Sequence, residues 1–284
     1  MKSKLFRSAP LPFQGQKRRF STAFKLVLNE LKQKRDVRII VDLFGGSGLL
    51  SHTAKAIFPD ARVIYNDYDG YTERLRNVSR TNELLADLRK MIPQGLSSDQ
   101  RLPPELSVKI LSRIKQEDQG GFVDYITISA SLTFSGKYAN TFEELSGLGF
   151  YNKIKASDYE FNAEDYLCGL EIVHADYKQL HQQYKDEPGV VFVVDPPYLS
   201  TDTSTYGSDK YWKLKDYLDV LHVLVNSNYI IFTSNKSSIV DLCEWIENNR
   251  HVGNPFSGSV LNIQQNSINY NAAYTDMMLY KFVK

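Results

Sequence analysis

The chain has 284 residues, an apolar share of 42% and a formal net charge of +1. This length predicts one large α/β domain or one domain with a substantial insertion, and the apolar share is enough to bury a full core. No stretch approaches the roughly 18 apolar residues of a membrane helix, and the basic N-terminus lacks the apolar segment of a secretory signal. We therefore expect a soluble, cytoplasmic protein with no membrane partner.

The two cysteines, Cys168 and Cys243, stand in unrelated contexts, and the five histidines show no metal-ligand spacing. We expect reduced core thiols and no metal site. Residues 1–38 hold eleven lysines and arginines against two acids, a balance that could meet a phosphate backbone. A solvated helix face explains the same pattern equally well.

The first elements in chain order form a βαβ unit. A helix is expected over about 22–34 with Ser21 as its N-cap, followed by a strand over 37–43 that ends in glycines. A second helix over about 48–58 and a strand over 61–66, ending at Asp67, complete the unit. The glycines allow a sharp turn and a close approach of backbone to a ligand.

Between residues 70 and 165 the pattern changes. A long helix is expected over 71–91 and a short one over 105–116, and the alternation in 123–128 hints at a strand. This segment is interpreted as an inserted domain or a large lobe.

Regular α/β order returns with a strand over 170–174 and a helix over 177–184. An apolar strand over 190–194 and a polar loop over 199–209 follow. A helix over about 211–226, a strand over 229–233 and a helix over about 237–249 come next. Segments 258–264 and 275–282 are expected to close the chain as an antiparallel pair.

The most informative tetrapeptide follows the apolar strand at 190–194 and reads Asp195, Pro196, Pro197, Tyr198. The prolines fix φ near −65° and leave two nitrogens without a hydrogen. The Asp195 carboxylate and the Pro196 carbonyl can then act as two acceptors beside a flat ring. Such a site suits a planar ligand with an amino group, for example a nucleobase.

The glycine turn at 45–48 is a weak signal by itself. Its spacing is neither that of a P-loop, which is excluded, nor the GxGxxG of a dinucleotide fold. Asp67, at the end of the second strand, fits an acceptor for ribose hydroxyls, with a strand-end turn residue as the alternative.

Together these features resemble the D12 class of DNA N6-adenine methyltransferases, the family that includes the Dam enzymes. The matching motifs follow the family's order along the chain: Pro12-Phe13-Gln14-Gly15-Gln16-Lys17, Asp42-Leu43-Phe44-Gly45-Gly46-Ser47-Gly48, Asn66-Asp67, Ala175-Asp176-Tyr177, Asp195-Pro196-Pro197-Tyr198 and Thr233-Ser234-Asn235. One departure is visible, because Gln16 stands where the family has its second glycine. It bears on the local turn rather than on the cofactor assignment.

The resemblance implies S-adenosylmethionine as the cofactor, with Asp67 on its ribose hydroxyls and Asp176 on its adenine amine. A cap of the following helix is the alternative for Asp176. Lys17 would lie near the cofactor carboxylate. The full set of implied cofactor residues is Phe13, Lys17, Asp42, Phe44, Gly45, Gly46, Ser47, Gly48, Asp67, Asp176 and Tyr177.

The implied fold is α/β, a mixed seven-stranded Rossmann-like methyltransferase sheet. Residues 1–69 and 166–284 would form the catalytic domain, and 70–165 a mainly helical target-recognition domain. The implied partner is double-stranded DNA, with a restriction endonuclease as a partner in function only. Arg18 and Arg19 are candidates for phosphate contacts, with a solvated surface as the alternative, and Tyr206 could stack near the target base or pack its own loop.

The chemistry agrees with the resemblance. Two acceptors can hold the hydrogens of an adenine amine and direct its lone pair at a methyl donor, once the base is flipped out of the duplex and stacked on Tyr198. Because we expect Asp195 to have a low pKa, its first role is orientation and its second general-base catalysis. N4-cytosine or RNA-adenine methylation, and a catalytically idle DNA-binding module, remain alternatives.

Overall fold

The computed structural model describes residues 6–97, 100–134, 138–159, 163–197, 214–234, 239–248, 256–269 and 272–282. The chain divides into two compact units. Unit 1 comprises Met1–Ser8, Lys17–Asp69 and Asp165–Lys284, and unit 2 comprises Ala9–Gln16 and Gly70–Glu164. Phe13 was expected in the catalytic domain, but its segment groups with the helical unit instead.

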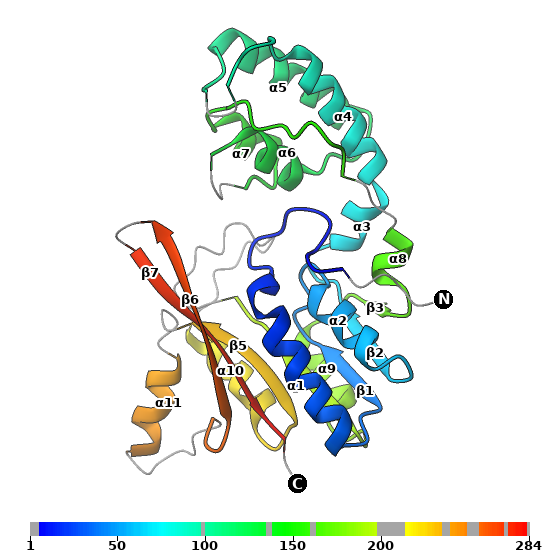
Figure 1. Cartoon of the computed structure of the whole chain (residues 1–284), viewed down its shortest axis with the longest axis vertical. Coiled ribbons are helices and arrows are strands. Elements are labelled where there is room, and N and C mark those ends of the chain that lie inside the picture. The colour runs from blue at the N-terminus through cyan, green and yellow to red at the C-terminus, as the bar shows by residue number, and fades with distance from the viewer. Residues whose placement is uncertain are drawn as a thin grey trace. The chain divides into compact units, whose positions relative to one another are not determined.

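Unit 1 is built on a seven-stranded sheet with the strand order β3-β2-β1-β4-β5-β7-β6 (Figure 1). Strands β3 to β5 in this order are parallel, and β7 runs antiparallel to both β5 and β6. The expected mixed seven-stranded Rossmann-like sheet is confirmed. The strands are β1 Ile39–Asp42, β2 Arg62–Asn66, β3 Glu171–Val173, β4 Val190–Val194, β5 Tyr229–Ser234, β6 Val260–Asn269 and β7 Ala272–Lys281.

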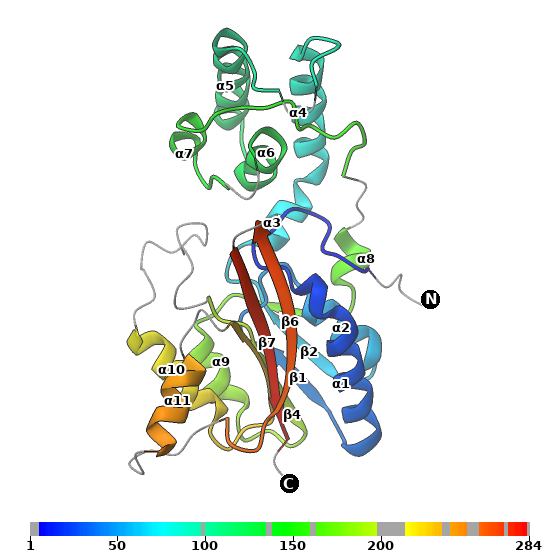
Figure 2. The ribbon, with the colours of Figure 1, turned by 60° about the vertical axis from the view of Figure 1, so that its left-hand side comes forward.

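Helices cover both faces of this sheet (Figure 2). Helices α1 (Ser21–Lys34) and α2 (Leu49–Ile57) pack on one face. The other face is covered by α9 (Tyr177–Tyr184), α10 (Leu214–Leu224) and α11 (Ile239–Asn248). Two short helices, η1 Lys17–Phe20 and α8 Ala163–Leu167, complete the described helices that contribute residues to unit 1.

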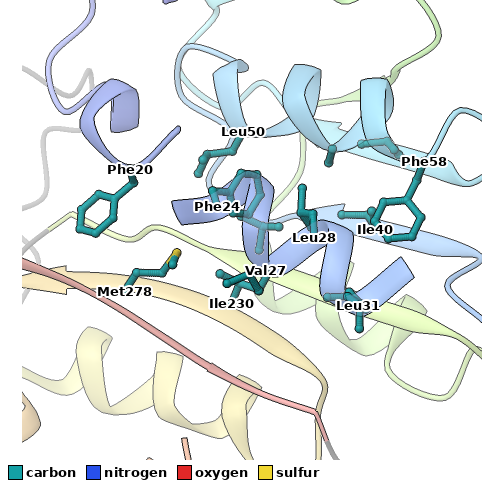
Figure 3. Packing of buried hydrophobic residues seen from close by; sticks show 14 of the residues in the cluster. Phe20, Phe24, Val27, Leu28, Leu31, Ile40, Leu50, Phe58, Ile230 and Met278 are labelled. Atoms are coloured by element: carbon teal, nitrogen blue, oxygen red, sulfur yellow. The ribbon is translucent and has the colours of Figure 1, made fainter. Parts of the chain in front are cut away.

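The packing explains why the central strands read as unbroken apolar runs. On α1 the buried side chains recur at helical spacing, from Phe24 through Val27 and Leu28 to Leu31, and they meet Ile40 and Ile230 of the sheet (Figure 3). Alternate residues of the same strands point into the opposite core. A sheet buried on both faces needs apolar side chains at every position.

Unit 2 is helical in its described part and has a core of its own. Its helices are α3 Tyr71–Arg76, α4 Val78–Met91, α5 Pro104–Gln119, α6 Tyr125–Leu132 and α7 Phe142–Ser146. The segment Ala9–Gln16 is tied to α3: the Tyr71 hydroxyl accepts from the Leu11 N–H at 2.9 Å, and Arg74 donates to the Pro12 carbonyl at 2.7 Å. A role in target recognition stays a prediction.

Three local expectations differ from the structure. Ser21 is the first residue of α1 rather than its cap, which is Phe20 with no side-chain hydrogen bond. The helix expected over 71–91 is interrupted at Asn77. The strand hinted at in 123–128 is wrong, because the Asp124 side chain accepts from the Thr127 N–H and begins helix α6.

No helix among the described residues combines the length and the apolar character that a membrane crossing requires.

Candidate active site

The candidate site lies at the carboxyl ends of β1, β2 and β4. These parallel strands are in register, with Asp42 of β1 opposite both Tyr65 of β2 and Val193 of β4. Their ends therefore reach the same edge of the sheet, which is where open α/β sheets bind ligands. The glycine turn follows β1, Asp67 follows β2, and Asp195 follows β4.

The glycine turn is shaped by Tyr65, a residue that the sequence did not single out. A Cβ at Gly45 would lie 2.3 Å from the Tyr65 ring, so only glycine fits there. The Tyr65 hydroxyl lies 2.7 Å from the Gly46 carbonyl oxygen and 3.1 Å from Asp67 Oδ1, between which its single hydrogen is shared. Burial raises the pKa of Tyr65 well above its ordinary value, so the phenol remains a donor.

The strand ends are joined by Asn66, whose role the sequence also did not reveal. Its side-chain amide donates to the carbonyls of Leu43 and Ala175, both at 2.9 Å, and its oxygen accepts from the Ala175 N–H at 3.0 Å. The Asn66 carbonyl accepts from the Gly45 N–H. One buried side chain therefore fixes the loops that follow β1, β2 and β3 relative to one another.

The residues that follow Asn66 are an acid, Asp67, and an aromatic residue, Tyr68. Asp67 is buried, whereas Tyr68 is 55% exposed and stacks on His174 with ring centroids 5.1 Å apart and planes at 6°. His174 Nδ1 donates to the Asp67 carbonyl at 3.0 Å. A carboxylate next to a flat, partly exposed ring suits a ribose with an attached base.

Asp42 is fully buried beneath the glycine turn. Its Oδ2 accepts from the Ser51 hydroxyl at 2.6 Å, which links the end of β1 to α2. Burial raises the pKa of Asp42 to about 7, and the negative charge of Asp195 acts in the same direction. Asp42 thus contributes to the site by holding the turn, and its direct contact with a cofactor stays a prediction.

The central feature is the ion pair between Lys17 and Asp195. Lys17 Nζ lies 2.6 Å from Asp195 Oδ2, and their side chains are only 9% and 14% exposed. Asp195 Oδ1 is buried and has no hydrogen-bond partner among the described residues. The pair therefore engages one carboxylate oxygen and presents the other as an acceptor.

The expected low pKa of Asp195 is wrong. Burial raises this pKa to about 6, Lys17 lowers it less strongly, and the charge of Asp276 raises it further. The sequence shows the acid but not its desolvation, which outweighs the nearby cation. The carboxylate is still ionised at pH 7.5, and it takes up a proton more readily than an exposed aspartate.

The remaining cofactor candidates lie at the amino end of α9. Asp176 Oδ1 accepts from the Lys178 N–H at 2.7 Å, so Asp176 caps this helix, as the alternative interpretation held. The cap engages Oδ1, and a role on the cofactor stays a prediction. The Tyr177 ring packs on Phe44 with centroids 4.8 Å apart, which fixes the side chain that precedes Gly45.

The other predicted residues stay predictions. Phe13 belongs to unit 2, where its ring meets Tyr71 edge to face at 5.8 Å. Arg18 and Arg19 are exposed on η1. Tyr198 and Tyr206 lie outside the described residues, and Pro196 and Pro197 follow Asp195 without regular secondary structure.

Comparisons with known proteins identify the family. The chain is 35% identical over 281 residues, 98% of its length and 94% of the other's, to a Haemophilus influenzae (strain ATCC 51907 / DSM 11121 / KW20 / Rd) protein named "Putative methyltransferase". The chain belongs to this methyltransferase family. No protein-family model matches the sequence of this chain.

A solved structure, the precorrin-6y C5,15-methyltransferase of Geobacter metallireducens GS-15, is similar at 10% identity and a TM-score of 0.33. The alignment covers 91% of this methyltransferase and 87% of that chain. A similarity of this size carries no inference about fold or substrate.

The cofactor of this methyltransferase is S-adenosylmethionine, and the residues present fit it. Asp67 and the exposed Tyr68 ring follow β2, where a nucleoside would need an acceptor and a stacking surface. The tight glycine turn leads into the N-terminus of α2, with Gly48 in the left-handed region at φ +74°. These groups would hold the nucleoside and the methionine part.

Proposed function

We propose that this methyltransferase is a site-specific DNA adenine-N6 methyltransferase that acts on a flipped adenine. The observation that carries the proposal is the acceptor Asp195 Oδ1, which is buried directly after β4 and has no hydrogen-bond partner among the described residues. An acceptor of this kind suits a ligand that brings an N–H group, because a buried acceptor without a donor is costly. An exocyclic amine is such a group.

When bound, S-adenosylmethionine supplies a methyl group on a positively charged sulfur. The chain's own residues prepare the amine that attacks it. Asp195 Oδ1 accepts one amine hydrogen, and the Pro196 carbonyl is the expected acceptor for the other. Holding both hydrogens aligns the nitrogen lone pair, and positioning of this kind can lower a barrier by about 7–11 kcal/mol.

The raised pKa of Asp195 gives it a second task. As the amine nitrogen gains a bond it becomes acidic, and a carboxylate with a pKa of about 6 can take its proton at Oδ1. Lys17 keeps the carboxylate ionised before the reaction through its contact with Oδ2. Orientation and proton acceptance therefore use the same oxygen.

The test is methyl transfer from labelled S-adenosylmethionine to a panel of duplexes, followed by nucleoside analysis. We expect N6-methyladenine from the wild type and from the surface variant Glu171→Gln, which alters only an exposed pair with Arg62. Asp195→Ala should lose activity by on the order of 10²-fold or more while still binding the cofactor.

Other products would revise the proposal in a defined way. Label in N4-methylcytosine, or in adenine of RNA only, would replace the substrate and keep the enzyme class. Binding of duplex with no detectable cofactor binding would indicate an idle module. Undiminished methylation by Asp195→Ala would contradict the assigned role of the carboxylate.

A further inference from the structure

An aromatic cluster of residues that the sequence did not predict for the site contacts the glycine turn. Tyr166, of helix α8, is fully buried, and its hydroxyl donates to the Ser47 carbonyl at 2.9 Å. Its backbone carbonyl lies 2.8 Å from His52 Nδ1 of helix α2. The Tyr166 and His52 rings stack with centroids 4.9 Å apart, and the Phe6 ring meets each of them edge-on at 5.3 Å.

The hydrogen bonds fix the protonation of His52. Its Nε2 accepts from the Phe6 N–H at 3.0 Å, so the ring proton of the neutral imidazole is on Nδ1 and is donated to the Tyr166 carbonyl. Burial lowers the pKa of His52, which favours this neutral form. The histidine therefore joins the N-terminal segment to α8 through one defined tautomer.

Two tyrosine hydroxyls hold consecutive carbonyls of the turn. Tyr65 is bonded to the Gly46 carbonyl and Tyr166 to the Ser47 carbonyl. A peptide unit is planar and trans, so fixing a carbonyl also fixes the direction of the N–H that follows it. Tyr65 thereby sets the direction of the Ser47 N–H, and Tyr166 that of the Gly48 N–H, which donates to the Gly45 carbonyl at 2.8 Å.

We propose that Tyr166, supported by His52 and Phe6, is a positioning residue that sets the affinity of the glycine turn for S-adenosylmethionine. The inference rests on the turn being the cofactor site. A Cβ at Gly48 would lie 3.6 Å from the Tyr166 ring and 3.5 Å from Leu167, so α8 is also in packing range of the turn. Without the Tyr166 hydroxyl, the Ser47 carbonyl would lose a buried partner, and the turn would sample other conformations.

The experiment measures S-adenosylmethionine binding by calorimetry, without DNA, for the wild type and for Tyr166→Phe. Loss of one buried hydrogen bond, worth about 1 kcal/mol, is expected to raise the Kd about five-fold. Hydrogen exchange of the peptide covering 43–50, again without cofactor, should become faster in Tyr166→Phe. Phe6→Ala, which removes the ring that covers His52, should change both quantities in the same direction.

The matched control is Tyr229→Phe. Tyr229 is also fully buried, and its hydroxyl lies 2.7 Å from the Ser259 hydroxyl, but it begins β5 and so lies at the amino end of that strand. This variant should lose comparable thermal stability and keep the wild-type Kd and loop exchange.

The two possible failures are distinct. If the wild type binds the cofactor and Tyr166→Phe matches it in Kd and in exchange, the positioning role is overturned alone. If the wild type binds no S-adenosylmethionine, the cofactor role of the turn fails, and this inference fails with it.

Discussion

Asp42 combines complete burial with a carboxylate, and this makes the stability of the protein depend on pH. Its pKa is about 7 in the folded chain against 3.8 as the ordinary value. The folded state then holds more protons than the unfolded state between about pH 4 and pH 7. Stability falls as the pH rises through this window. Asp42→Asn cannot ionise and does not lose this stability. The unfolding free energy of Asp42→Asn minus that of the wild type should therefore increase by up to about 4 kcal/mol from pH 4 to pH 8.

Urea unfolding of both proteins at the two pH values, without ligand, measures this difference. Asp219→Asn is the control, because the partly exposed Asp219 has its pKa lowered to about 2 by hydrogen bonds with Lys178 and Lys215. Its titration lies below the window, so this variant should keep the wild-type slope. A constant difference between Asp42→Asn and the wild type would show that Asp42 ionises normally.

Lys17 sets the pH at which Asp195 becomes an acceptor. The acid limb of kcat/KM is expected near pH 6, since a protonated Asp195 cannot accept at both oxygens. Lys17→Gln removes the nearby positive charge and should move this limb upward by roughly 1–3 pH units. Lys17→Arg keeps the charge and should leave the limb close to pH 6. A pH profile of Lys17→Gln that overlays that of the wild type would show that Lys17 does not influence the pKa of Asp195.

At the scale of elements, the glycine turn depends on a close approach that only Gly45 permits. A Cβ there would lie 2.3 Å from the Tyr65 ring and 2.8 Å from the Asn66 carbonyl oxygen. Gly45→Ala should therefore displace the turn, cost about 1–3 kcal/mol of stability and weaken cofactor binding. Gly147→Ala is the control, because its nearest neighbour lies at an ordinary 3.6 Å. Melting curves and calorimetry of both variants check the prediction.

In unit 2, an aromatic and basic cluster is the best place to test a DNA contact. Phe134 is 46% exposed, Lys153 Nζ lies 4.0 Å from the centre of its ring, and Tyr151 packs edge-on at 5.1 Å. Residues 71–165 carry more acids than bases, so the proposed DNA binding would have to use local clusters of this kind. Lys153→Ala should weaken duplex binding and reduce the salt slope by about one, unlike Lys109→Ala, which changes an exposed residue of α5. Anisotropy titrations at several salt concentrations measure both.

Elements with strong periodicity were predictable from the sequence. The apolar residues of α1 and the strands of the βαβ unit appear where their patterns place them, because burial dictates those patterns. Unit 2 was harder, since its 123–128 segment alternates like a strand yet begins a helix capped by Asp124. A single polar side chain outweighed the alternation there.

The candidate site was predictable only in part, for a related reason. Asp195 and the glycines stand at strand ends, which sequence order reveals. Three residues of the site act through hydrogen bonds to backbone carbonyls: Tyr65, Asn66 and Tyr166. Neither residue type nor sequence spacing predicts such bonds. The pKa of Asp195 failed similarly, because desolvation depends on what surrounds the carboxylate in space.

At the scale of the whole molecule, the chain passes between the two units four times, after residues 8, 16, 69 and 164. Each passage has a site residue close by on the unit 1 side. Phe6 bonds to His52, Lys17 pairs with Asp195, Asp67 follows β2, and Tyr166 holds Ser47. These four chain segments therefore connect unit 2 directly to residues of the candidate site.

We expect this connectivity to couple substrate and cofactor binding. A duplex that the protein methylates should lower the Kd for S-adenosylhomocysteine, the demethylated cofactor, by a factor of about 5 or more. The cofactor should tighten duplex binding by the same factor, since coupling free energies are reciprocal. Calorimetry with and without duplex, and anisotropy with and without cofactor, give the two factors independently. Tyr166→Phe should reduce both factors equally, because it removes a hydrogen bond next to the chain connection after residue 164. Equal affinities in the presence and absence of the second ligand would show that duplex binding and cofactor binding are not coupled.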